Sequence, residues 1–434
     1  MSALLVPYFS ALQAAPAVRW QGRVTQIVGN LLESCGPPCS LGECCEIQDA
    51  NGNIYPGEVV GFRGTTVLTM PLEKPSGVRY GDRIVALGSR PSLPVSEELI
   101  GRVIDGVGSP LDGCGRPRCA ERRALDGTAP RALERLPIRE PLGCGVRAID
   151  AFVTCGRGQR LGIFGGSGVG KSTLIGMMAR GTSAELTVLA LVGERGREVG
   201  EFLEALGERG RRKSVVVVST SDQSPLLRIR AALAATSIAE YFCQSGKNVL
   251  LVIDSLTRFA MAQREIGLAA GEPPTAKAYT PSVFSMLARL VERAGRFANG
   301  SITAFYTVLM EGDDQQDPLV DSVRSLVDGH IMLDRRLASQ GHYPPVSLLD
   351  SLSRLMPAVA SREHVTRSHQ LRSLLAAYAR SEDLVRIGAY SKGTDTELDR
   401  AIALLPRLNA FLRQGPDERP GFADTVALLS ALAP

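Results

Sequence analysis

The pattern of hydrophobic and polar residues changes character several times along the chain. From about residue 19 to 92, short β-branched stretches at 23–28, 57–62, 65–70 and 83–87 alternate with Gly, Pro, Asn and Asp. Short strands separated by turn residues are typical of a small β-barrel or sandwich. Residues 93–145 are rich in Gly, Pro and Arg, so we expect a connecting region there.

Apolar stretches alternate with helical ones from about residue 146 to 355. The expected strands are 160–164, 186–192, 214–219, 248–253, 302–309 and 329–333. Such alternation predicts a mostly parallel sheet with helices on both faces.

Beyond residue 356 the pattern becomes helical. One apolar face comprises Leu371, Leu374, Leu375 and Tyr378, and a second comprises Leu398, Ile402, Leu405, Leu408 and Leu412. Pro406 should bend or interrupt the second helix, because proline lacks the N–H that an inner helical turn uses.

Residues 1–18 form a separate N-terminal segment. Leu4, Leu5, Tyr8, Phe9 and Leu12 fall at helical spacing, which fits either a stripe that docks a partner or a frayed tail. The domain boundaries predicted from these patterns are 1–18, 19–92, 93–355 with its connecting region 93–145, and 356–434.

The amino-acid composition indicates how many domains to expect and argues against nucleic-acid-binding and membrane-spanning proteins. The 434 residues suggest roughly three domains, and 44% hydrophobic residues suffice for a real core. The net charge of +4, from 49 basic and 45 acidic residues, argues against an overall electrostatic grip on nucleic acid, and 5% aromatics argue against a base-stacking surface. Because there is neither an apolar run of about 20 residues nor a basic signal-peptide start, the sequence predicts a cytosolic protein.

Cysteines indicate no scaffold and no clear metal site. Cys35, Cys39, Cys44 and Cys45 cluster among the nine cysteines, but their spacing is not CxxC and no histidine accompanies them. Reduced, half-buried thiols are therefore favoured over a zinc site.

The clearest chemical signal is a glycine-rich loop. Residues 165–172 read Gly-Gly-Ser-Gly-Val-Gly-Lys-Ser and match GxxxxGK[ST], with a predicted strand before them and a predicted helix at 173–179 after them. In that context backbone N–H groups surround phosphate oxygens at a helix N-terminus. Lys171 should reach the β- and γ-phosphates, and the Ser172 hydroxyl should ligate Mg²⁺. The predicted nucleotide-binding residues of the loop are Gly165, Gly166, Ser167, Gly168, Val169, Gly170, Lys171, Ser172 and Thr173.

Two acidic residues follow other predicted strands. Asp254 ends the apolar stretch 248–253, and downstream of such a loop it is expected to hold Mg²⁺ through water. Glu194 follows the strand 186–192, where it could orient the attacking water or belong to a solvated charge cluster. Its spacing alone leaves these two interpretations open.

These motifs resemble a known family. GGSGVGKS, LVGERGREV and NVLLVIDSLTRFAMAQREI together are similar to the hexameric ATPases that include the rotary synthase catalytic subunit, from about residue 20 nearly to the end. Gly196 stands where the rotary subunit usually has Thr, and the acidic C-terminal motif of that subunit is absent. Stretches at 193–199, 271–275, 304–314 and 384–390 resemble the type III protein-export ATPases, most of all the flagellum-specific branch.

The resemblance implies a RecA-like α/β P-loop motor domain with an N-terminal β-barrel and a C-terminal α-helical domain, assembled into a ring. It implies that Glu194 is the catalytic carboxylate, that Arg195 is a neighbour of the catalytic centre, that Arg354 is an arginine finger and that Tyr343 stacks on adenine. Gly166 stands where the family usually has Ala, and glycine should still fit the loop.

The function that follows from the resemblance is hydrolysis of MgATP by a hexameric motor of a flagellar-type export apparatus. Its expected partners are further copies of the chain, a stalk-like regulator, a central stalk protein, export chaperones and substrates, and a membrane export gate that it meets peripherally at the inner membrane. Alternatives are a virulence secretion ATPase, an RNA-translocating hexamer and a rotary synthase subunit. Residues 19–92 offer few aromatics for RNA, such as Trp20, Tyr55, Phe62 and Tyr80.

Overall fold

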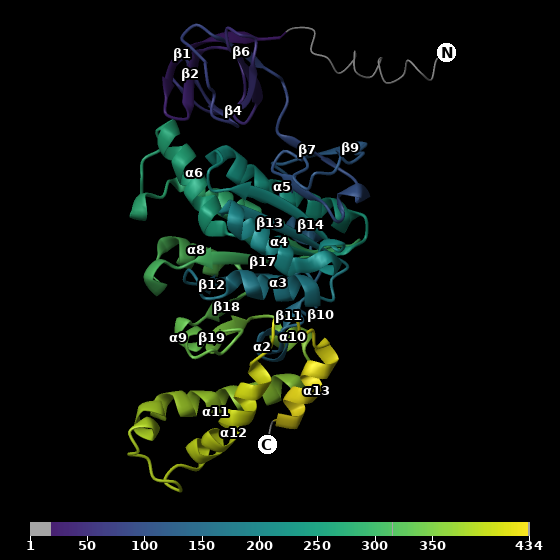
Figure 1. The fold of residues 1–434 in the computed structure, drawn as a ribbon, viewed down its shortest axis with the longest axis vertical. Helices are drawn as coiled ribbons and strands as arrows, with labels where there is room; N and C mark the ends of the chain where they lie inside the picture. The colour runs from purple at the N-terminus through teal and green to yellow at the C-terminus, as the bar shows by residue number, and fades with distance from the viewer. Residues whose placement is uncertain (1–18, 315, 433–434) are drawn as a thin grey trace, which may run out of the picture.

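The computed structural model describes residues 19–314 and 316–432. Within this part, a barrel, an α/β layer and a group of helices follow one another along the long axis of the molecule (Figure 1). The apolar stripe expected between Leu4 and Leu12 lies outside the described residues.

The N-terminal unit is a closed barrel of antiparallel strands in the order β1-β2-β5-β4-β3-β6. Closure decides between the barrel and the sandwich that the sequence left open. Val24, Leu32, Cys45, Ile47 and Ile84 form its small core. The strands are β1 (Gln21–Val28), β2 (Leu31–Cys35), β3 (Cys44–Gln48), β4 (Ile54–Arg63), β5 (Thr66–Pro71) and β6 (Arg83–Ala86).

The expected connecting region 93–145 contains more structure than its composition indicates. β7 (Ser92–Val95) pairs with β9 (Glu121–Ala124), and β8 (Val103–Asp105) joins the central sheet in parallel beside β14 (Ser214–Thr220). The segment thus supplies an edge strand of the motor domain. It also contains the 3₁₀ turns η1 (Glu97–Leu99) and η2 (Ala132–Glu134), and β10 (Pro141–Leu142), which pairs with β11 (Cys155–Gly156).

The central sheet has the order β19-β18-β12-β17-β15-β13-β14-β8, and β16 pairs with β17. All pairings are parallel except those of β16 and β19, as the sequence predicts for a mostly parallel sheet. The remaining strands are β12 (Arg160–Gly165), β13 (Leu186–Glu194), β15 (Asn248–Asp254), β16 (Gly295–Arg296), β17 (Ser301–Leu309), β18 (Gly329–Leu333) and β19 (Val346–Ser353).

Helices cover both faces of this sheet. Alternate residues of β13 point to opposite sides: Val188 and Ala190 pack in the cluster that includes α5 and α6, whereas Leu189 and Leu191 pack in the cluster that includes α3 and α4. The helices are α2 (Arg147–Phe152), α3 (Lys171–Gly181), α4 (Gly196–Arg211), α5 (Pro225–Gln244), α6 (Leu256–Ala270), α7 (Pro281–Val291), α8 (Pro318–Leu326) and α9 (Arg335–Ser339), with 3₁₀ turns η3 (Ala276–Ala278) and η4 (Glu311–Asp313).

The C-terminal unit consists of α10 (Met356–Val359), α11 (Arg362–Arg386), α12 (Thr396–Leu412) and α13 (Phe422–Leu432). The sequence predicts a bend or an interruption at Pro406, and the interruption is wrong, because α12 runs through this residue. Pro406 lies on the exposed side of the helix. The buried face of α12 is also displaced from the expected one, with Ala401 and Leu404 buried and Ile402 and Leu405 only half-buried.

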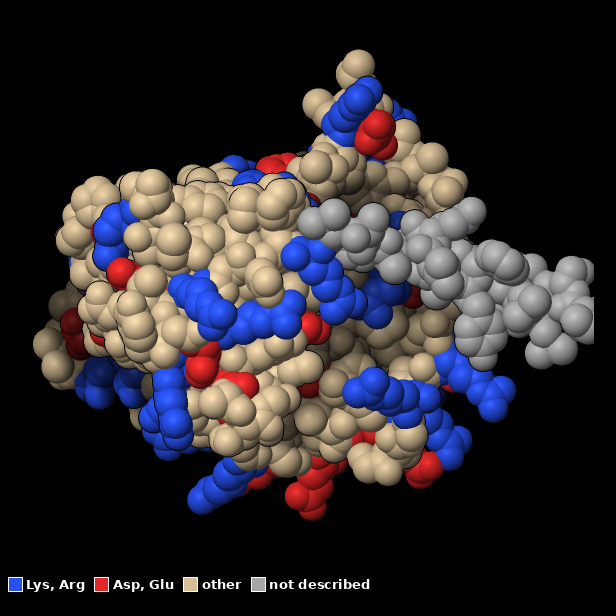
Figure 2. Space-filling view, turned by 90° about the horizontal axis from the view of Figure 1, so that it is seen from above, with Lys and Arg blue, Asp and Glu red and all other residues tan. Residues whose placement is uncertain are grey.

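Surface charge and thiols agree with the composition. In the view of Figure 2, basic and acidic side chains are interspersed and separated by wide uncharged areas. All nine cysteines are free, and Cys45 is the buried member of the cluster between Cys35 and Cys45. Within 19–314 and 316–432, no group of three or more His, Cys, Asp or Glu could hold a metal ion, and no helix is long and apolar enough to cross a membrane.

Candidate active site

The glycine-rich loop connects β12 to α3 at the carboxyl edge of the parallel sheet. Gly168 and Gly170 have φ values of +74° and +102°, a region that favours glycine because L side chains rarely adopt it. α3 begins directly at Lys171 with Gly170 as its N-cap, so the first helical N–H groups have no helical partner. Ser172 and Thr173 are exposed in this first turn. The sequence therefore builds an anion-binding helix start at the sheet edge.

Lys171 lies folded over its own loop. The residue is only 8% exposed. Its Nζ donates a hydrogen bond to the carbonyl oxygen of Gly165 at 2.8 Å and another to that of Gly166. The ammonium group is thus held at the loop, where phosphate oxygens could take over as its partners.

Asp254 ends β15, two strands away from β12 in the sheet. It is 5% exposed, and its Oδ1 accepts a hydrogen bond from Thr307 Oγ1 at 2.6 Å. Burial raises the pKa of this carboxyl, whereas the Thr307 hydrogen bond and the charge of Lys171 oppose that shift. Lys171, at the end of the loop that follows β12, and Asp254, at the end of β15, thus lie at the same edge of the sheet.

Glu194 ends β13, the neighbour of β15, and Leu191 pairs with Asp254 in the register. Burial raises the pKa of Glu194 to about 8, helped by its hydrogen bond to Glu198 and by the negative charge of Asp254. The pKa of Glu198 is lowered, chiefly by that same hydrogen bond. A carboxyl group that titrates near neutral pH beside a phosphate loop is suited to accept a proton from water.

Two further side chains at this edge escaped sequence reasoning. Arg258, in the first turn of α6, lowers the pKa of Glu194, Glu198 and Asp254 by its charge. A Cβ added to Gly193, with φ of +70°, would lie 3.1 Å from Arg258 Cβ, so the glycine lets the arginine approach. The position of Arg258, four residues after Asp254, could have indicated that it lies near this carboxylate. Thr307 had no such signal, because its partner is set by strand pairing.

The α6 helix, which carries Arg258, starts from a local signal. Ser255 follows Asp254 and caps the helix, since its side chain accepts a hydrogen bond from the backbone N–H of Arg258. Gly271 ends it with φ of +93°. The cap therefore fixes Arg258 directly after the acidic strand end.

Arg195 is largely exposed and contacts the site only through Glu198 among the contacts of the described residues. Its side chain is 79% exposed, and its Nε lies 3.9 Å from Glu198 Oε1. It is the N-cap residue of α4, and no side-chain cap hydrogen bond accompanies it. The expected role beside the catalytic centre stays a prediction.

Arg354 lies at the opposite edge of the sheet from its own glycine-rich loop. Ser353 pairs with Gly329 in β18, and the next residue of β18, His330, pairs with Gly162 of β12. Gly329 is thus level with Leu161, four residues or roughly 13 Å before Gly165 at ~3.3 Å per residue. Arg354 is exposed, so its side chain faces outward and does not reach the phosphate loop of its own chain.

Tyr343, between β18 and β19, lies beside the glycine-rich loop. A Cβ added to Gly170 would be 3.9 Å from Tyr343 Cε1, and the tyrosine is 48% exposed. Its carbonyl oxygen accepts a hydrogen bond from Gln414 N at 2.9 Å. The ring thus presents an open face next to the loop.

A cavity of about 410 Å³ adjoins the start of α3. It is lined in part by Ser172, Thr173, Glu198, Phe202 and Pro416. Residues of α3, α4 and the segment before α13 thus enclose a hollow next to the loop and its neighbouring carboxylates.

Comparison with known families matches three successive regions of the chain. Residues 24–88 match the beta-barrel domain of the ATP synthase alpha/beta family, and residues 145–353 match the nucleotide-binding domain of that family. Residues 360–431 match the T3SS EscN ATPase C-terminal domain.

Individual relatives match nearly the whole length. The flagellum-specific ATP synthase of Salmonella typhimurium is 51% identical, with 96% of this chain and 95% of the relative covered. The SPI-2 type 3 secretion system ATPase of the same organism is 49% identical, with 92% of each covered. The assembled ATPase EscN of the enteropathogenic E. coli type III secretion system has a TM-score of 0.90 at 43% identity, covering 95% of this chain and 99% of that chain. The chain therefore belongs to the ATP synthase alpha/beta family, in the branch of the flagellum-specific and type III secretion ATPases.

Proposed function

We propose that this export ATPase serves a flagellar-type apparatus and cleaves MgATP at interfaces between neighbouring subunits of a hexameric ring. The observation that carries the proposal is the separation within one chain of two parts of a phosphoryl-transfer site. Lys171, Asp254 and Glu194 gather at the carboxyl edge of the sheet, whereas Arg354 lies at the opposite edge. A second copy of the chain would complete the site.

ATP would bind with its phosphates on the glycine-rich loop. The N–H groups from Gly165 to Thr173 would surround the phosphate oxygens, and the Lys171 ammonium would exchange its loop carbonyls for β- and γ-phosphate oxygens. The exposed ring of Tyr343 beside Gly170 would stack on adenine.

The residues present fit a magnesium ion. The Ser172 hydroxyl and the Asp254 carboxylate are hard oxygen donors, the kind that Mg²⁺ prefers. Ser172 would bind the ion directly and Asp254 through water, while Thr307 fixes the carboxylate by its 2.6 Å hydrogen bond. When bound, the ion would neutralise charge on the phosphates during transfer.

Glu194 would take the proton of the attacking water. Its raised pKa gives it the basicity that a general base requires at neutral pH. Arg258 would keep the carboxylate in place once ionised, because its positive charge opposes the effects of Glu198 and Asp254. The Arg354 guanidinium of the neighbouring subunit would stabilise the charge on the transferring phosphoryl group.

Flagellar relatives support the flagellar assignment. Those from Bacillus subtilis, Salmonella typhimurium and Treponema pallidum are 50%, 51% and 50% identical, whereas the flagellar relative of Aquifex aeolicus and the type 3 secretion ATPase of Xanthomonas euvesicatoria are both 46% identical. The SPI-2 relative at 49% keeps the virulence system as the second candidate. Mass spectrometry of proteins pulled down from the native cell separates them, since rod or hook proteins are expected only in the flagellar case.

The proposed partners follow from the same relationship. EscN has been solved in complex with its central stalk EscO, which supports a central stalk partner for this chain. We include a stalk-like regulator, export chaperones and substrates, and a membrane gate that the ATPase meets peripherally from the cytoplasm. The match of residues 360–431 to an export-ATPase domain favours this assignment over a rotary synthase subunit.

Arg354→Ala tests the interfacial site. The variant should bind ATP normally and hydrolyse it on the order of 10³-fold more slowly, as other arginine fingers do. Lys171→Ala chains keep the finger and Arg354→Ala chains keep the loop, so co-assembled rings should regain activity at mixed interfaces. Per-chain activity should also fall on dilution as rings dissociate. Full turnover by a strictly monomeric protein would contradict the interfacial mechanism.

A further inference from the structure

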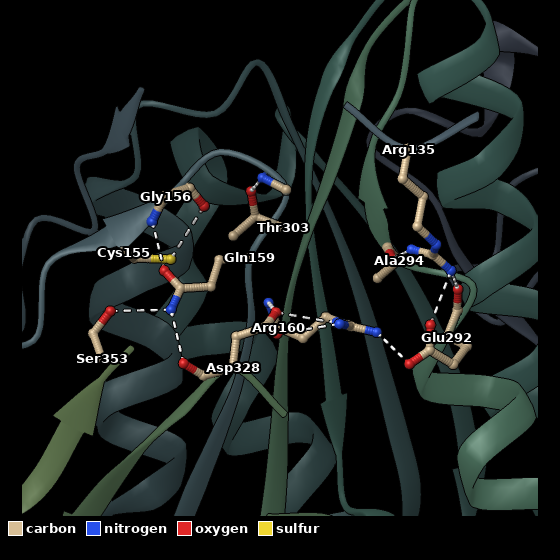
Figure 3. A network of polar contacts seen from close by, with 11 residues as sticks. Arg135, Cys155, Gly156, Gln159, Arg160, Glu292, Ala294, Thr303, Asp328 and Ser353 are labelled. Carbon is tan, nitrogen blue, oxygen red and sulfur yellow. Dashed lines mark hydrogen bonds and ion pairs between the residues drawn. The ribbon is translucent and has the colours of Figure 1, made fainter. Parts of the chain in front are cut away.

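A buried polar network joins the residue just before β12 to the segment that carries Arg354 (Figure 3). Gln159 is fully buried, and its Oε1 accepts a hydrogen bond from Gly156 N at 2.8 Å. Its Nε2 donates to Ser353 Oγ at 3.0 Å and to the Asp328 carbonyl oxygen at 3.3 Å. Ser353 in turn donates to the Thr154 carbonyl oxygen at 2.8 Å. The amide thus holds the residue directly before Arg354.

Asp328 is the second point at which this network meets Arg354. Its carbonyl oxygen accepts a hydrogen bond from Arg354 N at 3.0 Å as well as the bond from Gln159. Its carboxylate is held by Arg160 through the backbone N, Nε and Nη2, each at 3.1 Å. Arg160 Nη1 also pairs with Glu292 at 2.6 Å, as Figure 3 shows. Gln159 and Arg160 therefore hold the two backbone segments next to Arg354. One is Ser353, which precedes Arg354 in the chain, and the other is Asp328, whose carbonyl oxygen accepts the Arg354 N–H.

The strand β12 connects this network to the nucleotide site of the same subunit. Arg160 is its first residue and Gly165 its last, where the glycine-rich loop begins. One short buried strand thus carries the phosphate loop at one end and the anchor of Arg354 at the other.

We infer that Gln159 is a positioning residue for Arg354: through Ser353 and Asp328 it sets the backbone from which the guanidinium reaches the site of the neighbouring subunit. The inference rests on the proposed finger role of Arg354. Arg354 is exposed, so the direction of its side chain depends on this backbone. Only a side chain with both an acceptor and two N–H donors can make the three hydrogen bonds that Gln159 makes.

Two variants disturb the network in different ways. Gln159→Met keeps the size of the side chain and removes all three hydrogen bonds. Ser353→Ala removes the acceptor of one of them and also the bond that Ser353 donates to the Thr154 carbonyl oxygen. Thr303→Val is the matched control, because Thr303 is equally buried at 1% exposed and its Oγ1 accepts from Gly158 N at 2.8 Å without touching Ser353 or Asp328.

The expected result is a fall in kcat of about 10- to 100-fold for Gln159→Met, in keeping with the cost of a ~1 Å misplacement of a catalytic group. Ser353→Ala should fall in the same direction by less. The KM for ATP and the affinity for ATP should stay within about twofold for both, because the phosphate loop is unchanged. Thr303→Val should keep kcat near that of the wild type, whatever its melting temperature.

A double variant separates positioning from general damage. In the Arg354→Ala background, Gln159→Met should reduce single-turnover hydrolysis by no more than about twofold, since the residue it positions is gone. The inference would be overturned if the losses of Gln159→Met and Arg354→Ala multiplied in the double variant. It would also be overturned if Gln159→Met and Ser353→Ala had the same kcat as the control Thr303→Val. If Gln159→Met does not fold, Ser353→Ala tests whether the bonds of Ser353 Oγ to Gln159 and to the Thr154 carbonyl oxygen position Arg354.

The same experiments distinguish the inference from the proposed function. Normal turnover by Arg354→Ala would contradict the finger and with it the positioning role. Slow turnover by Arg354→Ala together with normal turnover by Gln159→Met and Ser353→Ala would contradict the positioning role alone.

Discussion

Replacing Glu194 by Gln tests the catalytic carboxylate together with its environment. The pKa of Glu194 is raised to about 8, first by burial and then by its hydrogen bond to Glu198 and the charge of Asp254. At pH 7 only about one-tenth of the free enzyme would therefore carry the ionised base, and at pH 6 about one-hundredth. We expect kcat/KM to rise about tenfold per pH unit below pH 7.5 and to level off above pH 9.

Glu194→Gln should abolish this dependence. The amide neither accepts the proton of water at these pH values nor changes charge, so the loss should be about 10²-fold or more at pH 9, typical of a missing general base. Because the wild type is itself about 10²-fold below its maximum at pH 6, the two enzymes should nearly converge there. The assay is steady-state release of phosphate at saturating Mg²⁺ between pH 6 and 9.5.

Glu198→Gln is the matched control. Glu198 accepts the hydrogen bond of protonated Glu194 and adds a negative charge beside it, so both effects raise the pKa of Glu194. Removing them should move the midpoint of the profile to lower pH and leave activity at pH 7 equal to or above that of the wild type. A mild Glu194→Gln variant together with an inactive Glu198→Gln variant would show that Glu198 is the base.

The raised pKa also affects stability, with a definite sign. Between the ordinary value of 4.5 and about 8, the folded chain keeps the Glu194 proton that the unfolded chain has released. Its contribution is therefore present below pH 4.5 and is lost as the pH rises toward 8. In the absence of nucleotide, the melting temperature of Glu194→Gln relative to the wild type should rise across this interval. A difference that does not vary with pH would refute the assigned titration.

Three further outcomes follow from the site. Lys171→Ala should abolish turnover while keeping the circular dichroism spectrum, since the bonds of its Nζ to the loop carbonyls of Gly165 and Gly166 are ones that nucleotide would replace; near-normal hydrolysis would remove the loop from the mechanism. Tyr343→Ala should weaken ATP binding by about 1 to 3 kcal/mol in calorimetry, the usual effect of losing an aromatic–base stack, whereas Tyr343→Phe should bind normally; equal affinities would exclude stacking. Deleting residues 1–18 should preserve the KM for ATP and weaken oligomers and binding of a stalk-like regulator in sedimentation experiments; unchanged association would assign this segment to a frayed tail.

Local sequence determined the parts of this protein that contiguous residues build. The loop 165–172 follows a strand and begins a helix as predicted, because its glycines and the helix start lie within one short stretch. The strands expected at 160–164, 186–192, 214–219, 248–253, 302–309 and 329–333 all occur with small shifts at their ends. Apolar β-branched runs between turn residues are a strong local signal for buried parallel strands.

Tertiary structure decided whatever depends on pairing between distant segments. β2 and β3 were missed because their Cys-, Gly- and Pro-containing surroundings resemble loops, and they become strands by closing the barrel. β8 lies in a stretch that composition describes as a connection, yet pairing with β14 makes it an edge strand. Pro406 fits within α12 because this residue, which has no N–H to donate, lies on the exposed side of the helix.

The chemistry of the site is divided in the same way. Sequence supplied Asp254 and Glu194 as separate strand ends and Lys171 as the start of a helix. Only the folded sheet buries Glu194, which is the main reason that its pKa is raised, and brings Asp254 beside it. The register of β19 against β18 puts Arg354 at the far edge from its own loop, and the hydrogen bond from Gln159 to Ser353 spans 194 residues. Hydrogen bonds over such separations depend on how the chain folds back on itself, a geometry that no local pattern of residues contains.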